Sequence, residues 1–189
     1  SAASILSKNG YDVHVHEIRS DSGARFDGDF QGLENWTGSK DFFDEMREWG
    51  LDPDSFKSDA FSVVDLIHPD DEITQPVTDG VAFRVVERGT DEHCIDQGFK
   101  RMAIEAGATI HYGSKRDPEE CQIIAAGPKD SSAVAFGEIF HTDHPNHVSF
   151  QLNDKLAPGA YSYLIVIDGI GLICTCLWRK QKKSGRYLN

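Results

Sequence analysis

The chain has 189 residues, of which 39% are hydrophobic and 10% aromatic, and its 19 basic and 31 acidic residues give a net charge of −12. Disordered chains usually lack such a share of large apolar side chains, so the composition indicates a globular protein of one domain or two small intertwined ones. The acidic balance excludes a broad basic surface for nucleic acid.

The cysteine content and the N-terminal residues bear on the cellular compartment. Four cysteines without a Cys-x-x-Cys pair do not make the dense disulfide framework of small secreted domains. The first residues contain no basic leader followed by an apolar core, so they do not resemble a secretory signal. We therefore expect a cytoplasmic protein, either free or attached peripherally to a membrane.

The first elements that the sequence predicts are a helix and a strand. Small and apolar residues before Gly10 favour a helix that ends there. Apolar side chains then alternate through residues 11–17, which predicts a strand that ends at Glu17. Residues 19–32 are rich in Gly, Ser and Asp, and this predicts a long loop of the kind that is often functional.

Two further helices are predicted in the first two thirds of the chain. Ser39 is expected to cap a helix that ends at Gly50, and Asp91 opens the most regular helix, which ends at Gly107. The apolar stripe of the first of these helices comprises Phe42, Phe43, Met46 and Trp49. Strand patterns cover residues 60–67 and 81–87, which we expect to pair antiparallel, and also 108–112 and the buried run 122–128.

After Ser131 the pattern changes to strands without helices. The predicted strands cover residues 134–142, 146–152, 161–167 and 171–178. The apolar stretch 161–178 is interrupted by Asp168, whose burial in lipid would be costly, so we expect no transmembrane segment there. This part of the chain therefore predicts an antiparallel layer.

The order helix, glycine, strand and acidic residue at the start of the chain is typical of the second half of a dinucleotide-binding βαβ unit. Glu17 is that acid, and a carboxylate at this place can accept both ribose hydroxyls of an adenosine. A solvated strand end is the alternative interpretation of Glu17. No Gly-x-Gly-x-x-Gly occurs in the 189 residues.

Longer stretches carry a more specific resemblance. The segments SAASILSKNGYDVHVHE, SGARFDGDFQGLENW, VVERGTDEHCIDQGFKRMAIEAGATIHYG and IIAAGP stand in the order found in FAD-dependent oxidoreductases. The sequence resembles the geranylgeranyl-reductase-like branch of the group that includes p-hydroxybenzoate hydroxylase. The resemblance covers most of residues 1–130 and continues more faintly through PGAYSYLIVIDGIG.

The resemblance implies positions for the residues that bind FAD. Glu17 matches the acid that holds the adenosine ribose, and Arg25 matches an arginine near the FAD. Arg88 begins a family pattern that runs to Ala108, with Asp91, Ile95, Ala103 and Gly107 at the corresponding places. Ala126 and Gly127 match a small-residue turn close to the cofactor. We expect the strand that ends at Glu17 to lie next to the strand that ends at Ala126.

The resemblance also implies an activity and a substrate side. Hydride would pass between the flavin and either NAD(P)H or an organic substrate, for which an isoprenoid-like or lipid-like molecule is one option. Tyr161 and Tyr163 match a strand that lines the family's substrate cavity, and ordinary core packing is the alternative for both. No side chain is identified as a catalytic acid or base.

The expected fold class is α/β, a partial Rossmann-like FAD-binding domain with an interleaved antiparallel sheet on the substrate side. Residues 1–57 and 88–130 would form the first part, and residues 58–87 and 131–189 the second. The resemblance implies a Gly-rich strand before Ser1 and a Gly-Asp motif beyond Asn189, so we expect an internal fragment that binds FAD poorly and self-associates. The alternative is a truncated, non-catalytic nucleotide-binding or interaction module.

Histidines and cysteines suggest a third, metal-binding hypothesis. His141, His144 and His147 surround Asp143, but their spacing matches no established site, and a polar turn is the simpler interpretation. His14 and His16 share one face of a strand and could chelate a metal or simply face water. Cys174 and Cys176 also share a face and are expected to be buried, unreactive thiols. We therefore assign no metal ligands from the sequence.

Overall fold

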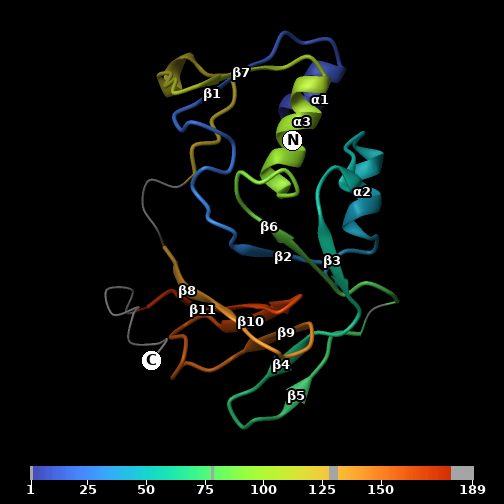
Figure 1. Cartoon of the computed structure of the whole chain (residues 1–189), viewed down its shortest axis with the longest axis vertical. Helices are drawn as coiled ribbons and strands as arrows, with labels where there is room; N and C mark the ends of the chain where they lie inside the picture. The colour runs from blue at the N-terminus through green and yellow to red at the C-terminus, as the bar shows by residue number, and fades with distance from the viewer. Residues whose placement is uncertain (1, 78, 128–131, 180–189) are drawn as a thin grey trace. The chain divides into compact units, whose positions relative to one another are not determined.

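The computed structural model describes residues 2–77, 79–127 and 132–179, and Figure 1 shows its elements. The chain divides into two compact units, one made of residues 1–58 and 85–126 and the other of residues 59–84 and 127–189. Each unit therefore contains two separate stretches of chain. Among the described residues, no helix is long and apolar enough to cross a membrane.

The first unit contains a parallel pair of strands, β1 (His14–Glu17) and β7 (Thr109–Tyr112). Helix α1 (Ala2–Lys8) precedes β1, and helix α3 (Ile95–Glu105) precedes β7. The two helices lie side by side in Figure 1. Gly10 and Gly107, which end them, have φ values of +83° and +99°, where a residue with a Cβ is strained. The predicted helix ends are confirmed.

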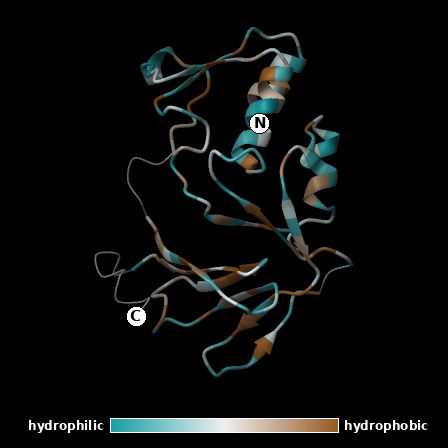
Figure 2. Ribbon diagram, in the orientation of Figure 1, coloured by the Kyte–Doolittle hydropathy of each residue, from teal (hydrophilic) through white to brown (hydrophobic). Residues whose placement is uncertain are grey.

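The core of the first unit lies between helix α2 (Phe42–Glu48), the start of α3 and the short helix η1 (Pro53–Ser55). Its buried side chains are Phe43, Met46, Leu51, Phe56, Val86, Ile95 and Met102. The α3 ribbon in Figure 2 alternates between hydrophobic and hydrophilic segments, so one face is apolar and can enter the core. Trp49 is 50% exposed, so its expected place in the buried stripe is wrong.

The starts of helices α2 and α3 differ from those expected. Asp41, and not Ser39, caps α2, since its Oδ1 accepts a hydrogen bond of 2.8 Å from the Phe43 amide. Helix α3 begins after Cys94, and Asp91 lies in the preceding turn, where its carbonyl accepts from the Cys94 amide at 2.9 Å.

A three-stranded sheet has the order β2 (Phe30–Glu34), β6 (Phe83–Glu87) and β3 (Ser58–Phe61). The division between the two units falls within β3 and β6. β2 occupies the end of the expected loop 19–32, so that part of the loop prediction is wrong. The single strand expected over 60–67 is also wrong, because β3 ends at Phe61 and a separate strand, β4 (Asp65–Ile67), joins another sheet.

The second unit is built on a six-stranded sheet with the order β5-β4-β9-β10-β11-β8. The strands not yet named are β5 (Ile73–Thr74), β8 (Val134–His141), β9 (His147–Gln151), β10 (Ser162–Ile167) and β11 (Ile170–Leu177). The predicted antiparallel pairings hold from β9 through β8. The pair β4 and β9 is parallel, so the sheet is mixed and not wholly antiparallel. The α/β class is confirmed by this combination of helices and sheets.

The buried strand expected over residues 122–128 is absent from the described part of that segment, residues 122–127. Ile123 and Ile124 are 57% and 62% exposed. β1 pairs with β7, where Glu17 stands opposite Tyr112, so the expected pairing of the Glu17 strand with a strand ending at Ala126 is wrong. An apolar run becomes a buried strand only where both of its faces are covered.

Candidate functional site

Glu17 ends β1 at the carboxyl end of a parallel pair, as predicted from the sequence. Its Oε1 accepts a hydrogen bond of 2.8 Å from the Arg19 amide, and its carbonyl accepts one of 3.0 Å from the Ser114 amide. The side chain is half-buried. These contacts fix the carboxylate at the point where the chain leaves the strand, which is where nucleotides bind in open α/β sheets.

The loop after Glu17 is tied to α3 by polar contacts. Lys100 Nζ lies 2.6 Å from Asp21 Oδ1, and Gln97 Nε2 donates to the Ser22 carbonyl at 2.7 Å. The Ser22 hydroxyl lies 3.0 Å from the Tyr112 hydroxyl on β7. Burial by itself would raise the pKa of Asp21, but hydrogen bonds from Lys100 and the Ser22 amide outweigh it, so that pKa lies below its usual 3.8.

Gly23 brings this loop into close contact with the turn before α3. A Cβ at Gly23 would lie 2.7 Å from the Gly89 carbonyl carbon and 2.8 Å from Asp96 Cβ, and φ is +81°. Both the space and the backbone conformation therefore require glycine. The Gly28 amide also donates to the Arg88 carbonyl at 3.2 Å, so the loop is fixed at both ends.

Phe26 brings two arginines that the sequence singled out to the same place. The guanidinium carbon of Arg88 lies 4.0 Å from the centroid of the Phe26 ring, and that of Arg25 lies 5.7 Å from it. Nε and Nη2 of Arg88 donate to the two Asp96 carboxylate oxygens at 2.8 and 2.9 Å. Arg25 is exposed, and in the described structure it forms no ion pair with a carboxylate.

The remaining cofactor residues expected from the sequence, Ala126 and Gly127, lie in exposed, irregular chain. Gly127 has a φ of +73°, with open space where a Cβ would be. No strand of the described structure leads into these two residues.

Tyr161 and Tyr163 belong to an aromatic cluster of the second unit. The Phe150 ring lies 5.6 Å from that of Tyr161, 6.0 Å from that of Tyr163 and 5.5 Å from that of Phe83, measured between centroids. Burial and a hydrogen bond with Cys174 raise the pKa of Tyr163, so its phenol stays protonated near neutral pH.

Histidines form a ladder on the β1–β7 pair. His14 Nδ1 lies 2.9 Å from His111 Nε2, and the His16 and His111 rings stack with centroids 4.7 Å apart. His16 Nδ1 lies 2.8 Å from the Ser114 hydroxyl. Desolvation and the nearby Arg116 lower the pKa of His16. These nitrogens contact one another or a hydroxyl, which fits the interpretation of a polar strand face.

The group of His141, His144 and His147 with Asp143 lies at the end of β8, in the connection to β9 and at the start of β9. His144 Nδ1 contacts the Pro145 carbonyl at 2.8 Å, and His147 Nε2 lies 3.9 Å from Asp65 Oδ2. Within the described ranges, this group does not bring three metal-ligating atoms together. The segment between His141 and His147 connects β8 to β9.

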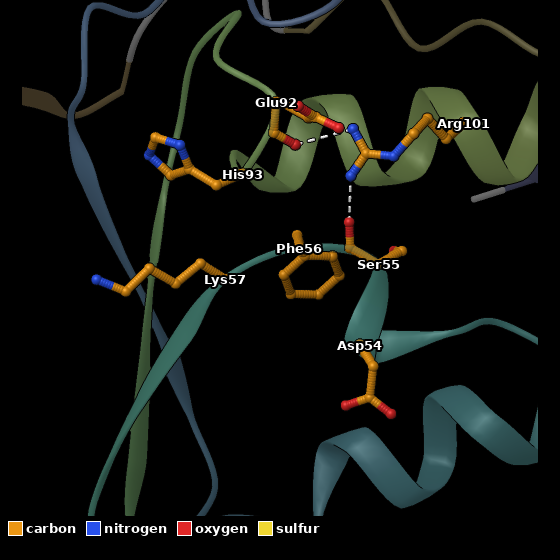
Figure 3. A pocket seen from close by; sticks show the side chains of 7 residues that line it. All are labelled: Asp54, Ser55, Phe56, Lys57, Glu92, His93 and Arg101. Atoms are coloured by element: carbon orange, nitrogen blue, oxygen red, sulfur yellow. Dashed lines mark hydrogen bonds between the residues drawn. The ribbon is translucent and has the colours of Figure 1, made fainter.

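The first unit also contains a pocket of about 460 Å³ beside the start of α3, lined by Asp54, Ser55, Phe56, Lys57, Glu92, His93 and Arg101 (Figure 3). Arg101 Nη1 donates to the Glu92 carbonyl at 2.8 Å, and Nη2 donates to the Ser55 carbonyl. The arginine therefore ties η1 to the turn before α3.

Comparison with solved structures relates this arrangement to known folds. A geranylgeranyl bacteriochlorophyll reductase-like protein from Thermoplasma acidophilum aligns with a TM-score of 0.66 at 15% identity, over 99% of this chain and 56% of that chain. The tetrameric form of 2-methyl-3-hydroxypyridine-5-carboxylic acid oxygenase aligns with a TM-score of 0.55 at 14% identity, over 93% of this chain and 54% of the oxygenase chain.

A flavoprotein/dehydrogenase from Cytophaga hutchinsonii aligns with a TM-score of 0.56 at 12% identity, over 93% of this chain and 52% of that one. The chain thus spans about half the length of the solved structures it matches. No family model matches the sequence, and no curated protein does. The structural likeness to a geranylgeranyl reductase-like protein agrees with the resemblance found in the sequence, and it shows that this chain has the fold of the matching half of these proteins.

Proposed function

We propose that the chain is part of an FAD-dependent oxidoreductase and that the end of β1 and the loop after it bind the cofactor. The observation that carries this proposal is the docking of residues 19–29 on α3, which holds Arg25 exposed beside Phe26 in the loop that follows Glu17. In open α/β sheets a ligand binds where such loops leave the carboxyl ends of the strands.

The donor and acceptor chemistry of these residues fits FAD. The Glu17 carboxylate can accept from ribose hydroxyls, and the exposed guanidinium of Arg25 offers several N–H donors to the flavin side of the cofactor. Arg88 has a different role from Arg25, because two nitrogens of the Arg88 guanidinium already donate to Asp96. We assign Arg88 to holding Phe26 and the loop, and not to a direct bond with FAD.

Bound FAD would supply hydride transfer to or from an organic substrate, with NAD(P)H as one donor option. The protein side of this chemistry is placement and the exclusion of water. The aromatic cluster around Tyr161 and Tyr163 supports an apolar, isoprenoid-like or lipid-like substrate, because aromatic rings dominate the lining of pockets for such ligands.

Titration of the chain with FAD, followed by quenching of flavin fluorescence, tests the proposal. We expect saturable but weak binding, because the 189 residues contain no Gly-x-Gly-x-x-Gly to donate backbone N–H groups to the pyrophosphate. Arg25→Ala should weaken binding by about 1 to 3 kcal/mol through loss of a charged hydrogen bond. Glu17→Gln should weaken it as well.

Arg47→Ala is the matched control, because Arg47 is an exposed arginine of the same unit that pairs with Asp44 on α2. Its FAD affinity should equal that of the unchanged chain. Equal affinity in Arg25→Ala would remove that residue from the site. A chain that binds no FAD at all would favour the non-catalytic interaction module.

A further inference from the structure

Three side chains with different metal-ligating atoms meet where β6 ends and α3 begins. One ligand atom each from Glu87, His93 and Cys94 lie within 4.8 Å of one another. His93 Nε2 is 2.9 Å from Glu87 Oε2. Over residues 2–77, 79–127 and 132–179, no other group of three or more such side chains meets this condition.

The backbone that presents these side chains is fixed on both sides. The Gly89 amide donates to Asp96 Oδ2 at 3.1 Å, and the Cys94 amide donates to the Asp91 carbonyl at 2.9 Å. The His93 carbonyl accepts from the Lys57 amide at 2.9 Å. A ligand set on a backbone held in this way loses little conformational freedom when it binds an ion.

Space around the thiol is limited by the turn itself. A Cβ at Gly89 would lie 3.4 Å from Cys94 Sγ, and φ at this glycine is +150°, so glycine allows the turn to approach the sulfur. Cys94 is 1% exposed, whereas the side chains of His93 and Glu87 are 45% and 27% exposed. The set therefore has a closed side at the sulfur and an open side toward solvent, and Figure 3 shows His93 directed away from Arg101.

The local charge favours a cation. The Glu87 carboxylate lies within 4.8 Å of the ligand atoms of His93 and Cys94, and the Asp96 carboxylate accepts a hydrogen bond from the Gly89 amide in the same turn. These negative charges would stabilise a divalent cation at this place.

We propose that Glu87, His93 and Cys94 bind Zn²⁺, with water in the fourth position on the open side. Zinc accepts sulfur, imidazole nitrogen and carboxylate oxygen together, and tetrahedral coordination places such atoms about 3.4 to 3.6 Å apart. The present separations, all within 4.8 Å, need only small side-chain shifts. Binding releases the thiol proton to solvent and replaces the bond between His93 and Glu87 with one metal bond to each.

The expected role of the ion is to join the end of β6 to the start of α3. The segment between Glu87 and Cys94 carries Arg88, so the ion would stiffen the turn that holds Phe26. This inference stands apart from the proposed function, because it needs no flavin and no substrate.

The test begins with protein dialysed against a chelator and then titrated with Zn²⁺. A ligand that binds only the folded state at a hundredfold excess over Kd should raise Tm by about 5 to 10 °C for a chain of this size. His93→Gln and Cys94→Ser should lose this rise. The controls His144→Gln and Cys121→Ser, which alter a histidine and a cysteine elsewhere, should keep it.

Co²⁺ in place of Zn²⁺ gives a second readout, because a cobalt–thiolate bond adds a charge-transfer band to the absorption spectrum. The band should appear in the unchanged chain and be lost in Cys94→Ser. If Cys94→Ser does not fold, His93→Gln and the cobalt spectrum of the unchanged chain decide. Absence of zinc binding, a Tm rise that survives in His93→Gln, or a rise lost only in His144→Gln would overturn the proposal.

Discussion

Replacement of Gly23 by alanine tests whether the loop after β1 is held against the turn before α3 by shape. The residue combines a φ of +81° with a neighbouring backbone so close that an added Cβ would lie 2.7 Å from the Gly89 carbonyl carbon. Gly10 is a matched position, because its φ is +83° but nothing lies within 4 Å of the place of its Cβ. The two substitutions share the backbone strain and differ in the clash.

The magnitudes follow from these two contributions. Alanine in a left-handed conformation costs about 1 to 2 kcal/mol, and this is the whole effect expected for Gly10→Ala. Overpacking against a backbone that cannot move freely adds about 1 to 3 kcal/mol at Gly23. For a chain of this length each kcal/mol corresponds to about 2 to 4 °C in Tm. Gly23→Ala should therefore lower Tm clearly more than Gly10→Ala.

Thermal denaturation followed by circular dichroism measures the difference, and amide hydrogen exchange locates it. In Gly23→Ala, protection should fall in residues 19–29 and at the start of α3, since these are the segments forced apart. FAD affinity should fall with it, because Arg25 lies in the released loop. Equal Tm losses for the two variants would refute the close packing of Gly23 on Gly89.

Two further predictions concern charges on α3 and the loop. Asp96→Asn should lower the free energy of unfolding by about 1.5 to 3 kcal/mol, since the Asp96 side chain is 15% exposed and holds Arg88. Asp44→Asn, at a side chain that is 66% exposed and pairs with Arg47, should cost less than about 1 kcal/mol. Urea denaturation compares the two variants, and similar losses of stability would contradict the structural role given to Asp96. Because the pKa of Asp21 is lowered in the folded chain, its stabilising contribution is present above pH 3.8 and is lost as pH falls through the folded value. Lys100→Met should remove that part of the acid dependence in denaturation measured between pH 5 and 2, and an unchanged profile would refute it.

Local signals account for what the sequence predicted well. The ends of α1 and α3 were predicted from Gly10 and Gly107, whose left-handed conformations stop a helix without help from distant residues. The strands after residue 132 were predicted from short alternating runs and turns, and the pairings of β9 with β10 and of β10 with β11 follow from adjacency along the chain. The pairing of β8 with β11 joins strands that are not adjacent in sequence. The helix ends and the strand patterns depend on residues a few positions apart.

The elements that were predicted wrongly depend on tertiary contacts. The run at residues 122–127 is as apolar as a buried strand, yet no strand of the described structure covers it, and both of its isoleucines are exposed. The parallel pairing of β4 with β9 joins segments more than eighty residues apart, for which the sequence of each strand carries no signal. The Asp41 side chain, which caps α2 where Ser39 was expected, also accepts a hydrogen bond of 3.0 Å from Asn35 Nδ2, and the spacing of residues alone does not predict this contact.

Some residues of the candidate site were proposed from the sequence, and others become evident only in the structure. Glu17 was proposed from its place at the end of a strand, and Arg25 from the resemblance to FAD-dependent oxidoreductases. Phe26 and Asp96 were missed, because no sequence pattern around either residue indicates its contacts. The contact of Phe26 with Arg88 joins residues more than sixty positions apart. The Glu87, His93 and Cys94 set was missed as well, since its spacing matches no established metal motif.

The residues that sequence analysis missed are connected through Asp96. Asp96, in the first turn of α3, accepts hydrogen bonds from both the Arg88 side chain and the Gly89 amide. The first bond places the guanidinium over Phe26, and the second shapes the turn that approaches Cys94 Sγ and leaves room for Gly23. One carboxylate thus organises the loop of the proposed cofactor site and the proposed zinc site together, although it is expected to touch neither ligand. Its effect on both should be that of a positioning residue, which changes affinity without supplying a bond.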